Sequence, residues 1–193
     1  MDELNKKWLK GKRNFYFRYK YKVVESKIVG RCLNVGCGEH KIKGATNVDY
    51  PTVDASKLPY KNNSFDTVIL SDVIEHLDYF KSQTAVAEAC RVAKKKVLIT
   101  IPAMKSLWSK YDDLLGHYRR YKKDDFVMMF FLYPREWKMK YTYLFGLLYP
   151  LFFIRRWTSG KTPVTPNWID NILFWCSHIR LPFGSTLFVE ITK

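Results

Sequence analysis

Two glycines and one acid in the first half of the chain have the types and spacing to hold a nucleotide-like ligand. Gly36 and Gly38 surround Cys37 directly after a short apolar strand predicted over residues 32–35. Two glycines around one residue let the chain leave a strand sharply and expose backbone N–H groups to a ligand. A second short strand ends in Asp49. A carboxylate at the tip of a second parallel strand can accept hydrogen bonds from both hydroxyls of a ribose.

A second polar stretch, residues 107–121, has the residue types for binding an anionic acceptor and moving its proton; we call it the lid. It follows the carboxyl end of another predicted strand, so it should arch over the same crevice as the glycine loop. His117 lies between Asp112 and the pair Arg119 and Arg120. Guanidinium groups can grip an anion while a histidine takes its proton. The alternative is that Asp112 pairs with one of the arginines and only holds the lid in place.

The elements that must position these residues are strands and helices, which alternate from the third strand onwards. Strands are predicted over residues 32–35, 45–48, 65–70, 97–101, 137–145 and 185–192, and helices over residues 78–93, 124–132 and 167–177. The three lysines at 94–96 are expected in a solvated turn. Residues 146–157 predict either a helix packed on the sheet or one that lies in a membrane interface.

The order of the motifs resembles the class I S-adenosylmethionine-dependent methyltransferases, in particular the type 11-like group. The motifs are Asn34-Val35-Gly36-Cys37-Gly38, Asp54-Ala55, Leu58-Pro59-Tyr60, Ser64-Phe65-Asp66 and Glu75-His76. The lid adds Trp108, Asp112 and the run Gly116 to Tyr121, which resembles a subgroup of that family. Many members of this subgroup are associated with glycan or polyprenyl-lipid assembly.

This resemblance implies an α/β fold, a Rossmann-like and mostly parallel twisted sheet with an antiparallel last strand. It implies S-adenosyl-L-methionine as the cofactor, bound by Asn34, Gly36, Cys37, Gly38, Asp49, Asp54, Ala55 and Asp72. Asp54 with Ala55 should meet the adenine, and Asp72 should lie near the sulfonium or the acceptor. His117 is the first candidate for a catalytic base and His76 the second. Trp108, Asp112, Arg119 and Arg120 are the expected substrate-binding residues.

The chain also departs from the family pattern. A third loop glycine is replaced by Glu39 and His40. Too few residues separate Gly36 from Asp49, and Asp49 from Asp54, for full crossovers with long helices. We therefore expect trimmed crossover helices, and either Asp49 or Asp54 could meet the ribose.

Length and composition favour one folded domain over residues 31–193, preceded by a basic, aromatic N-terminal arm or helix over residues 1–30. The chain has 193 residues, 47% of them hydrophobic, and a formal net charge of +15. Such a charge favours an anionic partner: a small-molecule, glycan- or lipid-linked substrate, an acidic membrane surface, or nucleic acid as the second choice. The arm's aromatic residues either stack on such a partner or pack on the sheet.

Four cysteines without a Cys-x-x-Cys pair, and the lack of a secretory signal at the start, favour a reduced cytoplasmic compartment without a metal site. Peripheral contact with the inner face of a membrane is compatible with this. The expected function is methyl transfer to a small-molecule, glycan- or lipid-linked acceptor. The alternatives are an RNA or protein methyltransferase that uses the N-terminal arm, and a non-catalytic binding module with the same fold.

Overall fold

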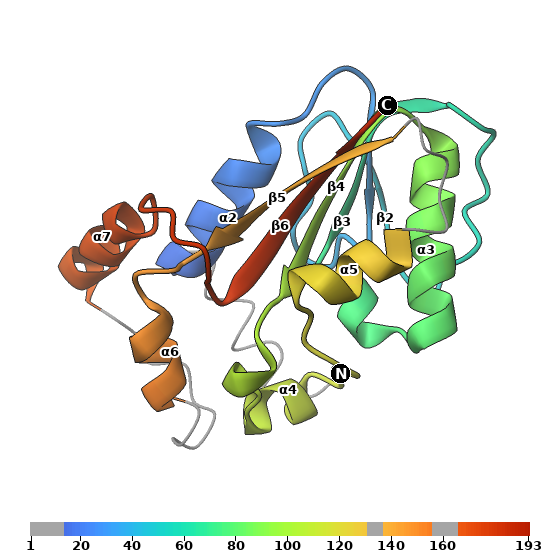
Figure 1. Ribbon diagram of the computed structural model, residues 1–193. Coiled ribbons are helices and arrows are strands. Elements are labelled where there is room, and N and C mark those ends of the chain that lie inside the picture. The colour runs from blue at the N-terminus through green and yellow to red at the C-terminus, as the bar shows by residue number, and fades with distance from the viewer. Residues whose placement is uncertain (1–13, 131–136, 156–165) are drawn as a thin grey trace.

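A six-stranded sheet runs through the middle of the protein in the computed structural model, which describes residues 14–130, 137–155 and 166–193 (Figure 1). Its strands are β1 (Cys32–Val35), β2 (Thr46–Val48), β3 (Phe65–Ser71), β4 (Ala93–Pro102), β5 (Lys138–Leu144) and β6 (Thr186–Thr192). They lie in the order β2-β1-β3-β4-β6-β5. Strands β1 to β4 are parallel, and β6 is antiparallel to both β4 and β5. The predicted fold class, a mostly parallel sheet with an antiparallel last strand, is confirmed.

Helices cover both faces of this sheet. The α-helices are α2 (Phe15–Glu25), α3 (Tyr79–Val92), α4 (Lys110–Leu114), α5 (Lys123–Phe130), α6 (Tyr149–Arg155) and α7 (Asn167–Cys176), and the 3-10 helices are η1 (Ile74–His76) and η2 (Lys105–Leu107). In Figure 1, α3 and α5 lie on one side of the sheet and α2 on the other. None of the described helices is long and apolar enough to cross a membrane.

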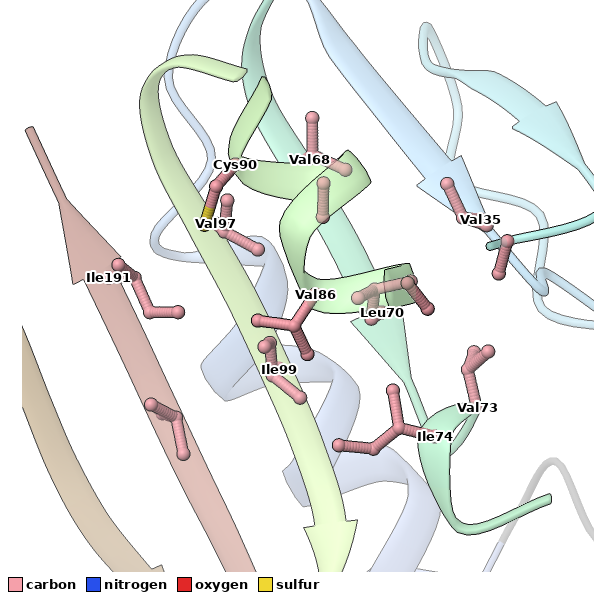
Figure 2. Close-up of a cluster of buried hydrophobic side chains, with 14 of the residues drawn as sticks. Val35, Val68, Leu70, Val73, Ile74, Val86, Cys90, Val97, Ile99 and Ile191 are labelled. Carbon is pink, nitrogen blue, oxygen red and sulfur yellow. The ribbon is translucent and has the colours of Figure 1, made fainter. Parts of the chain in front are cut away.

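The larger core cluster lies between α3 and the parallel strands. Figure 2 shows Val86 and Cys90 of α3 beside Val97 and Ile99 of β4, with Leu70 of β3 next to them. All but Cys90 are fully buried, and Cys90 is 6% exposed. Strand segments that are covered on both faces read as continuous apolar runs, which is why the sequence revealed the centres of β3 and β4.

The second cluster lies under α2 on the opposite face. Asn14 caps this helix through its side chain, and the helix then buries Phe15, Tyr19 and Val24 against the sheet. The described part of the predicted arm therefore packs on the sheet. Residues 1–13, which include Trp8, lie outside the described residues.

The crossovers around β2 are trimmed, as predicted. Residues 36–45 and 49–64, all of which the structure describes, form turns and contain no helix. The short connections keep the carboxyl ends of β1 and β2 close to the loops that come after them.

The prediction of a solvated turn at Lys94–Lys96 is wrong, because β4 begins at Ala93 and runs through the three lysines. Two of them find acidic partners on neighbouring strands: Lys95 pairs with Asp66 at 2.9 Å and Lys96 with Glu190 at 2.8 Å. Pairing with the end of β6 extends the strand beyond its apolar centre.

Candidate functional site

Five of the eight predicted cofactor residues lie directly after neighbouring parallel strands, at one edge of the sheet: Gly36, Cys37, Gly38, Asp49 and Asp72. Val35, the last residue of β1, pairs with Val48 of β2 and Leu70 of β3, and Leu70 pairs with Ile99 of β4. The strands therefore end nearly level, and this brings the loops at their carboxyl ends together. Gly36, Asp49, Asp72 and the lid come after β1, β2, β3 and β4 in turn. This is the edge at which open parallel sheets bind ligands.

The glycine loop is shaped by close packing and by positive backbone angles. Gly36 has φ +65°, and a Cβ at this position would lie 2.5 Å from the side chain of Val73. Gly38 has φ +46°, with no atom within 4 Å of its Cβ position. Its N–H donates to Asp49 Oδ2 at 3.0 Å, and the N–H of Cys37 donates to the Val48 carbonyl at 3.1 Å. The loop is thus a closed turn with open space beside Gly38.

Asn34 supports this loop from below. Its side chain is buried, and Nδ2 donates to the carbonyl of His40 at 3.0 Å and to Asn47 Oδ1 at 2.9 Å. Both contacts are internal to the protein. Asn34 therefore positions the glycine loop against β2.

The two candidate acids for the ribose differ in their surroundings. Asp49 lies at the tip of β2 and accepts from the N–H groups of Gly38 and Tyr50. Asp54 closes a local turn by accepting from the backbone and hydroxyl of Ser56, and these hydrogen bonds lower the pKa of Asp54. Ala55 packs in the core, with 9% exposure. Asp49, beside the glycine loop, is the better placed of the two acids.

Asp72 has a partner that the sequence did not reveal. Lys20 of α2 is fully buried, and its Nζ donates to Asp72 Oδ2, while Thr100 donates to Oδ1 at 3.0 Å. Burial alone lowers the pKa of Lys20, but attraction to Asp72 and nearby tyrosines raises it above its ordinary value. In the sequence Lys20 is one of several lysines in a basic arm, and no local signal distinguishes it.

The lid is held together by the carboxylate of Asp112, which is fully buried. This carboxylate accepts from Ser109 at the start of α4, from His117 Nδ1 at 2.9 Å, and from Nε and Nη2 of Arg120 at 2.8 and 3.0 Å. Burial alone would raise the pKa of Asp112, but the hydrogen bonds from His117 and Arg120 hold it below its usual range. Arg120 also donates to the carbonyl of Ala103 at 3.2 Å.

The four residues that were predicted to bind the substrate differ in their partners within the protein. Arg120 faces inward to Asp112, which is the lid-fixing arrangement left open by the sequence. Arg119 instead lies over the ring of Tyr79 at 5.1 Å from its centroid. Trp108 donates through Nε1 to Asp113 at 3.0 Å, on the lid itself.

The two predicted catalytic histidines are neighbours in space. The rings of His76, on η1, and His117, on the lid, have centroids 4.7 Å apart and meet edge to face. Glu75, which precedes His76 on η1, is fully buried. Burial, and after it the positive charge of His117, lowers the pKa of His76. Burial and then the negative charge of Asp72 raise the pKa of Glu75 well above its ordinary value.

A pocket of about 640 Å³ lies elsewhere, and none of the predicted site residues lines it. Its walls include Lys122 and Lys123 before and in α5, and Tyr141 of β5. The ammonium group of Lys123 lies 4.2 Å from the centroid of the Tyr141 ring. The candidate site is the edge of the sheet where the predicted residues lie, and this pocket is not part of it.

Comparison with known proteins gives one family match. Residues 18–101, from the first half of α2 to the last residue but one of β4, match the model of a methyltransferase domain. The match contains the glycine loop, Asp49, Asp72 and Glu75. No curated protein sequence matches the chain.

Solved structures resemble nearly the whole chain at low sequence identity. One is an S-adenosylmethionine-dependent methyltransferase of Thermotoga maritima, described as a possible histamine N-methyltransferase: 15% identity, TM-score 0.63, covering 98% of this chain and 94% of that one. Another is a small RNA methyltransferase, with 9% identity and a TM-score of 0.56; the match covers 91% of this chain and 25% of that one. A third is the magnesium protoporphyrin IX methyltransferase of Synechocystis with bound S-adenosylhomocysteine. It has 12% identity and a TM-score of 0.50, and the match covers 93% of this chain and 81% of that one. The three share a fold and differ in the acceptors that their descriptions name.

Proposed function

We propose that this chain, which has a methyltransferase domain and the fold of the S-adenosylmethionine-dependent methyltransferases, transfers a methyl group to an anionic, lipid-linked acceptor. The observation that carries the methyl-transfer part is the placement of the glycine loop, Asp49 and Asp72 at level strand ends within the matched region. The acceptor class rests on the surface around the lid.

The residues at the sheet edge fit S-adenosylmethionine. Gly36 leaves no room for a side chain against Val73, while the position beside Gly38 is open to a ligand. Asp49 offers a carboxylate for the ribose hydroxyls, and its contacts with backbone N–H groups hold it at the strand tip. Asp72, fixed by Lys20 and Thr100, holds a negative charge at the next strand end.

S-adenosylmethionine, when bound, supplies an electrophilic methyl group on a sulfonium. The protein accelerates such an in-line transfer chiefly by holding the acceptor in position. If the acceptor must lose a proton, His117 is placed to take it at Nε2, because Asp112 holds Nδ1 and so orients the ring. His76 is the second candidate for this role.

An apolar surface next to the lid favours a lipid-linked acceptor. Leu114 of α4 is 64% exposed, and Ile154 of α6 is 67% exposed. In Figure 1 the two helices lie at the lower edge of the molecule, and the hydroxyls of Ser106 and Tyr149 join η2 to α6 at 2.8 Å. Lys105 and Lys110 on this side are exposed. Apolar side chains beside lysines suit an anionic lipid surface.

The nucleic-acid alternative loses support from α2. Phe15 and Tyr19 are buried in the core, and Tyr16 stacks on Phe145 at 4.5 Å, so these rings cannot stack on bases. We therefore keep the membrane proposal alone.

Calorimetry of the purified chain with S-adenosylmethionine tests cofactor binding. Asp49→Ala should weaken binding about 5- to 150-fold, because about 1–3 kcal/mol is lost when a hydrogen-bonded partner is left unmet. Asp124→Ala, which removes an exposed acid of α5, is the matched control and should bind like the native chain. Absence of binding by the native chain at millimolar cofactor would overturn the proposal.

Sedimentation with phosphatidylglycerol vesicles tests the acceptor side. The native chain should sediment, and the double variant Phe153→Asp with Ile154→Asp should stay in the supernatant. Val127→Asp with Met128→Asp, on exposed positions of α5, is the matched control and should still sediment. If the native chain ignores these vesicles, or if both double variants behave alike, the membrane part of the proposal is wrong.

A further inference from the structure

Three side chains with metal-binding atoms converge where η1 meets the lid. Glu75, His76 and His117 each offer one donor atom, and the three donors lie within 4.8 Å of one another. Glu75 and His76 are adjacent on η1, whereas His117 arrives from more than 40 residues along the chain, by way of β4. The Tyr118 N–H donates to the Glu75 carbonyl at 2.7 Å, which fixes the lid against η1 at this point.

The carboxylate of Glu75 needs a partner that the described part of the protein does not supply. The residue is 0% exposed, and apart from its own backbone N–H, neither carboxylate oxygen has a hydrogen-bond partner among the described residues. Burial of an unpaired polar group is costly, and burial of an unpaired charge costs much more. A bound cation would supply this partner and remove the cost.

Both histidines are oriented as metal ligands usually are. His117 donates through Nδ1 to Asp112 Oδ1 at 2.9 Å, which leaves Nε2 as an acceptor of a metal. His76 makes a hydrogen bond with the backbone of Leu115. A ligating histidine commonly donates its other ring N–H to a carboxylate or a backbone carbonyl, which fixes the tautomer and the ring plane. In this protein the second contact of each histidine, to Asp112 for His117 and to Leu115 for His76, is made with a residue of the lid.

From these three observations we infer that Glu75, His76 and His117 bind one divalent transition-metal cation at the carboxyl edge of the sheet. Two imidazoles and one carboxylate suit zinc, iron, cobalt or manganese better than magnesium or calcium, which prefer oxygen donors. Zinc lies about 2.0–2.2 Å from such donors, so two ligands of one ion are at most about 4.4 Å apart. The cation would draw the three side chains slightly together.

The role of the cation in the reaction rests on the proposed function. Three protein ligands leave a coordination position for a further oxygen. An acceptor hydroxyl bound there would release its proton to water more readily. The oxygen electron pair would then form the bond to the methyl carbon, and the pair of the breaking C–S bond would stay on sulfur. In this arrangement His117 is a ligand, so it cannot also serve as the base through Nε2.

Cobalt(II) is the probe, because its visible absorption reports coordination by protein ligands. The full chain, stripped with a chelator and kept in a phosphine reductant, is titrated with Co²⁺ in the absence of S-adenosylmethionine. We expect one equivalent to bind and to raise the unfolding temperature of the native chain. Glu75→Gln and His117→Gln should each weaken binding at least about tenfold and abolish the thermal shift.

The matched controls are Glu39→Gln and His178→Gln, which change exposed residues outside the cluster and should bind Co²⁺ like the native chain. Glu75→Gln should fold, because its carboxylate makes no hydrogen bond with any other described residue. The unfolding temperature of this variant in chelator should equal or exceed that of the native chain. If the native chain does not bind Co²⁺, or if the variants of the cluster bind it unchanged, the cation site is wrong.

Calorimetry with S-adenosylmethionine separates the two proposals. A native chain that binds S-adenosylmethionine but no Co²⁺ would leave the proposed function standing and remove the cation. A native chain that binds Co²⁺ at Glu75 but no S-adenosylmethionine would keep the cation site and remove the proposed function.

Discussion

The lid should owe its structure to the charge of Asp112, and Asp112→Asn tests this most directly. The substitution keeps the size of the side chain and removes only its charge. Asp112 is 0% exposed, and the side chain of its partner Arg120 is 13% exposed. In the variant the guanidinium stays buried without a counter-charge, and the hydrogen bond from His117 meets an amide instead of a carboxylate.

The expected cost can be worked out from the burial of this pair. Breaking a buried ion pair by removing one partner destabilises proteins by about 3–5 kcal/mol, since the remaining charge is uncompensated. For a chain of this size, 1 kcal/mol corresponds to about 2–4 °C in the unfolding temperature. Asp112→Asn should therefore lower that temperature by about 6–20 °C. Asp113→Asn, the exposed neighbour, is the matched control and should cost no more than about 0.5–1 kcal/mol.

Urea unfolding with tryptophan fluorescence as the signal measures these differences. A double-mutant cycle with Arg120→Leu isolates the pair: the double variant should cost less than the sum of the single variants, by about 0.5–3 kcal/mol. A cost below about 1 kcal/mol for Asp112→Asn, or single costs that simply add, would refute the reasoning that this carboxylate holds the lid.

Two further predictions concern the supports of the sheet edge. Hydrogen bonds from Arg91 hold the pKa of Glu88 below its ordinary value, so the native chain should be more stable than Glu88→Gln above the unfolded pKa of about 4.3. Urea unfolding at a series of pH values should show this advantage shrinking as the pH falls through the folded pKa. Lys20→Met should leave Asp72 without its buried partner and lower the free energy of unfolding by about 1–3 kcal/mol. An unchanged free energy would mean that hydration of the partly exposed Asp72 replaces the lysine.

The elements that the sequence predicted well are those with local signals. The centre of β3, residues 68–70, reads as a continuous apolar run because both of its faces are covered. Asp78 caps α3, and the periodic apolar segment that predicted this helix begins at the same residue. The glycine loop comes directly after β1, and its positive φ angles at Gly36 and Gly38 are what glycine permits. In each case, the residues that determine the conformation are close in sequence.

The failures come from contacts between distant segments. The lysines at 94–96 read as a polar turn, but pairing with β6 and the acids Asp66 and Glu190 makes them part of β4. Likewise, the sequence left open whether an arginine would face Asp112 or an acceptor. The tertiary structure assigns Arg120 to Asp112.

The sequence by itself determined the order of strands and loops, and with it the edge at which a cofactor of the methyltransferase type would bind. It could not show that Lys20 reaches Asp72, or that Glu75 is buried beside His76 and His117 with no partner among the described residues. Burial and charge pairing depend on which faces meet once α2 and the lid pack on the sheet. Because those meetings join residues that lie tens of positions apart, only the tertiary structure decided them.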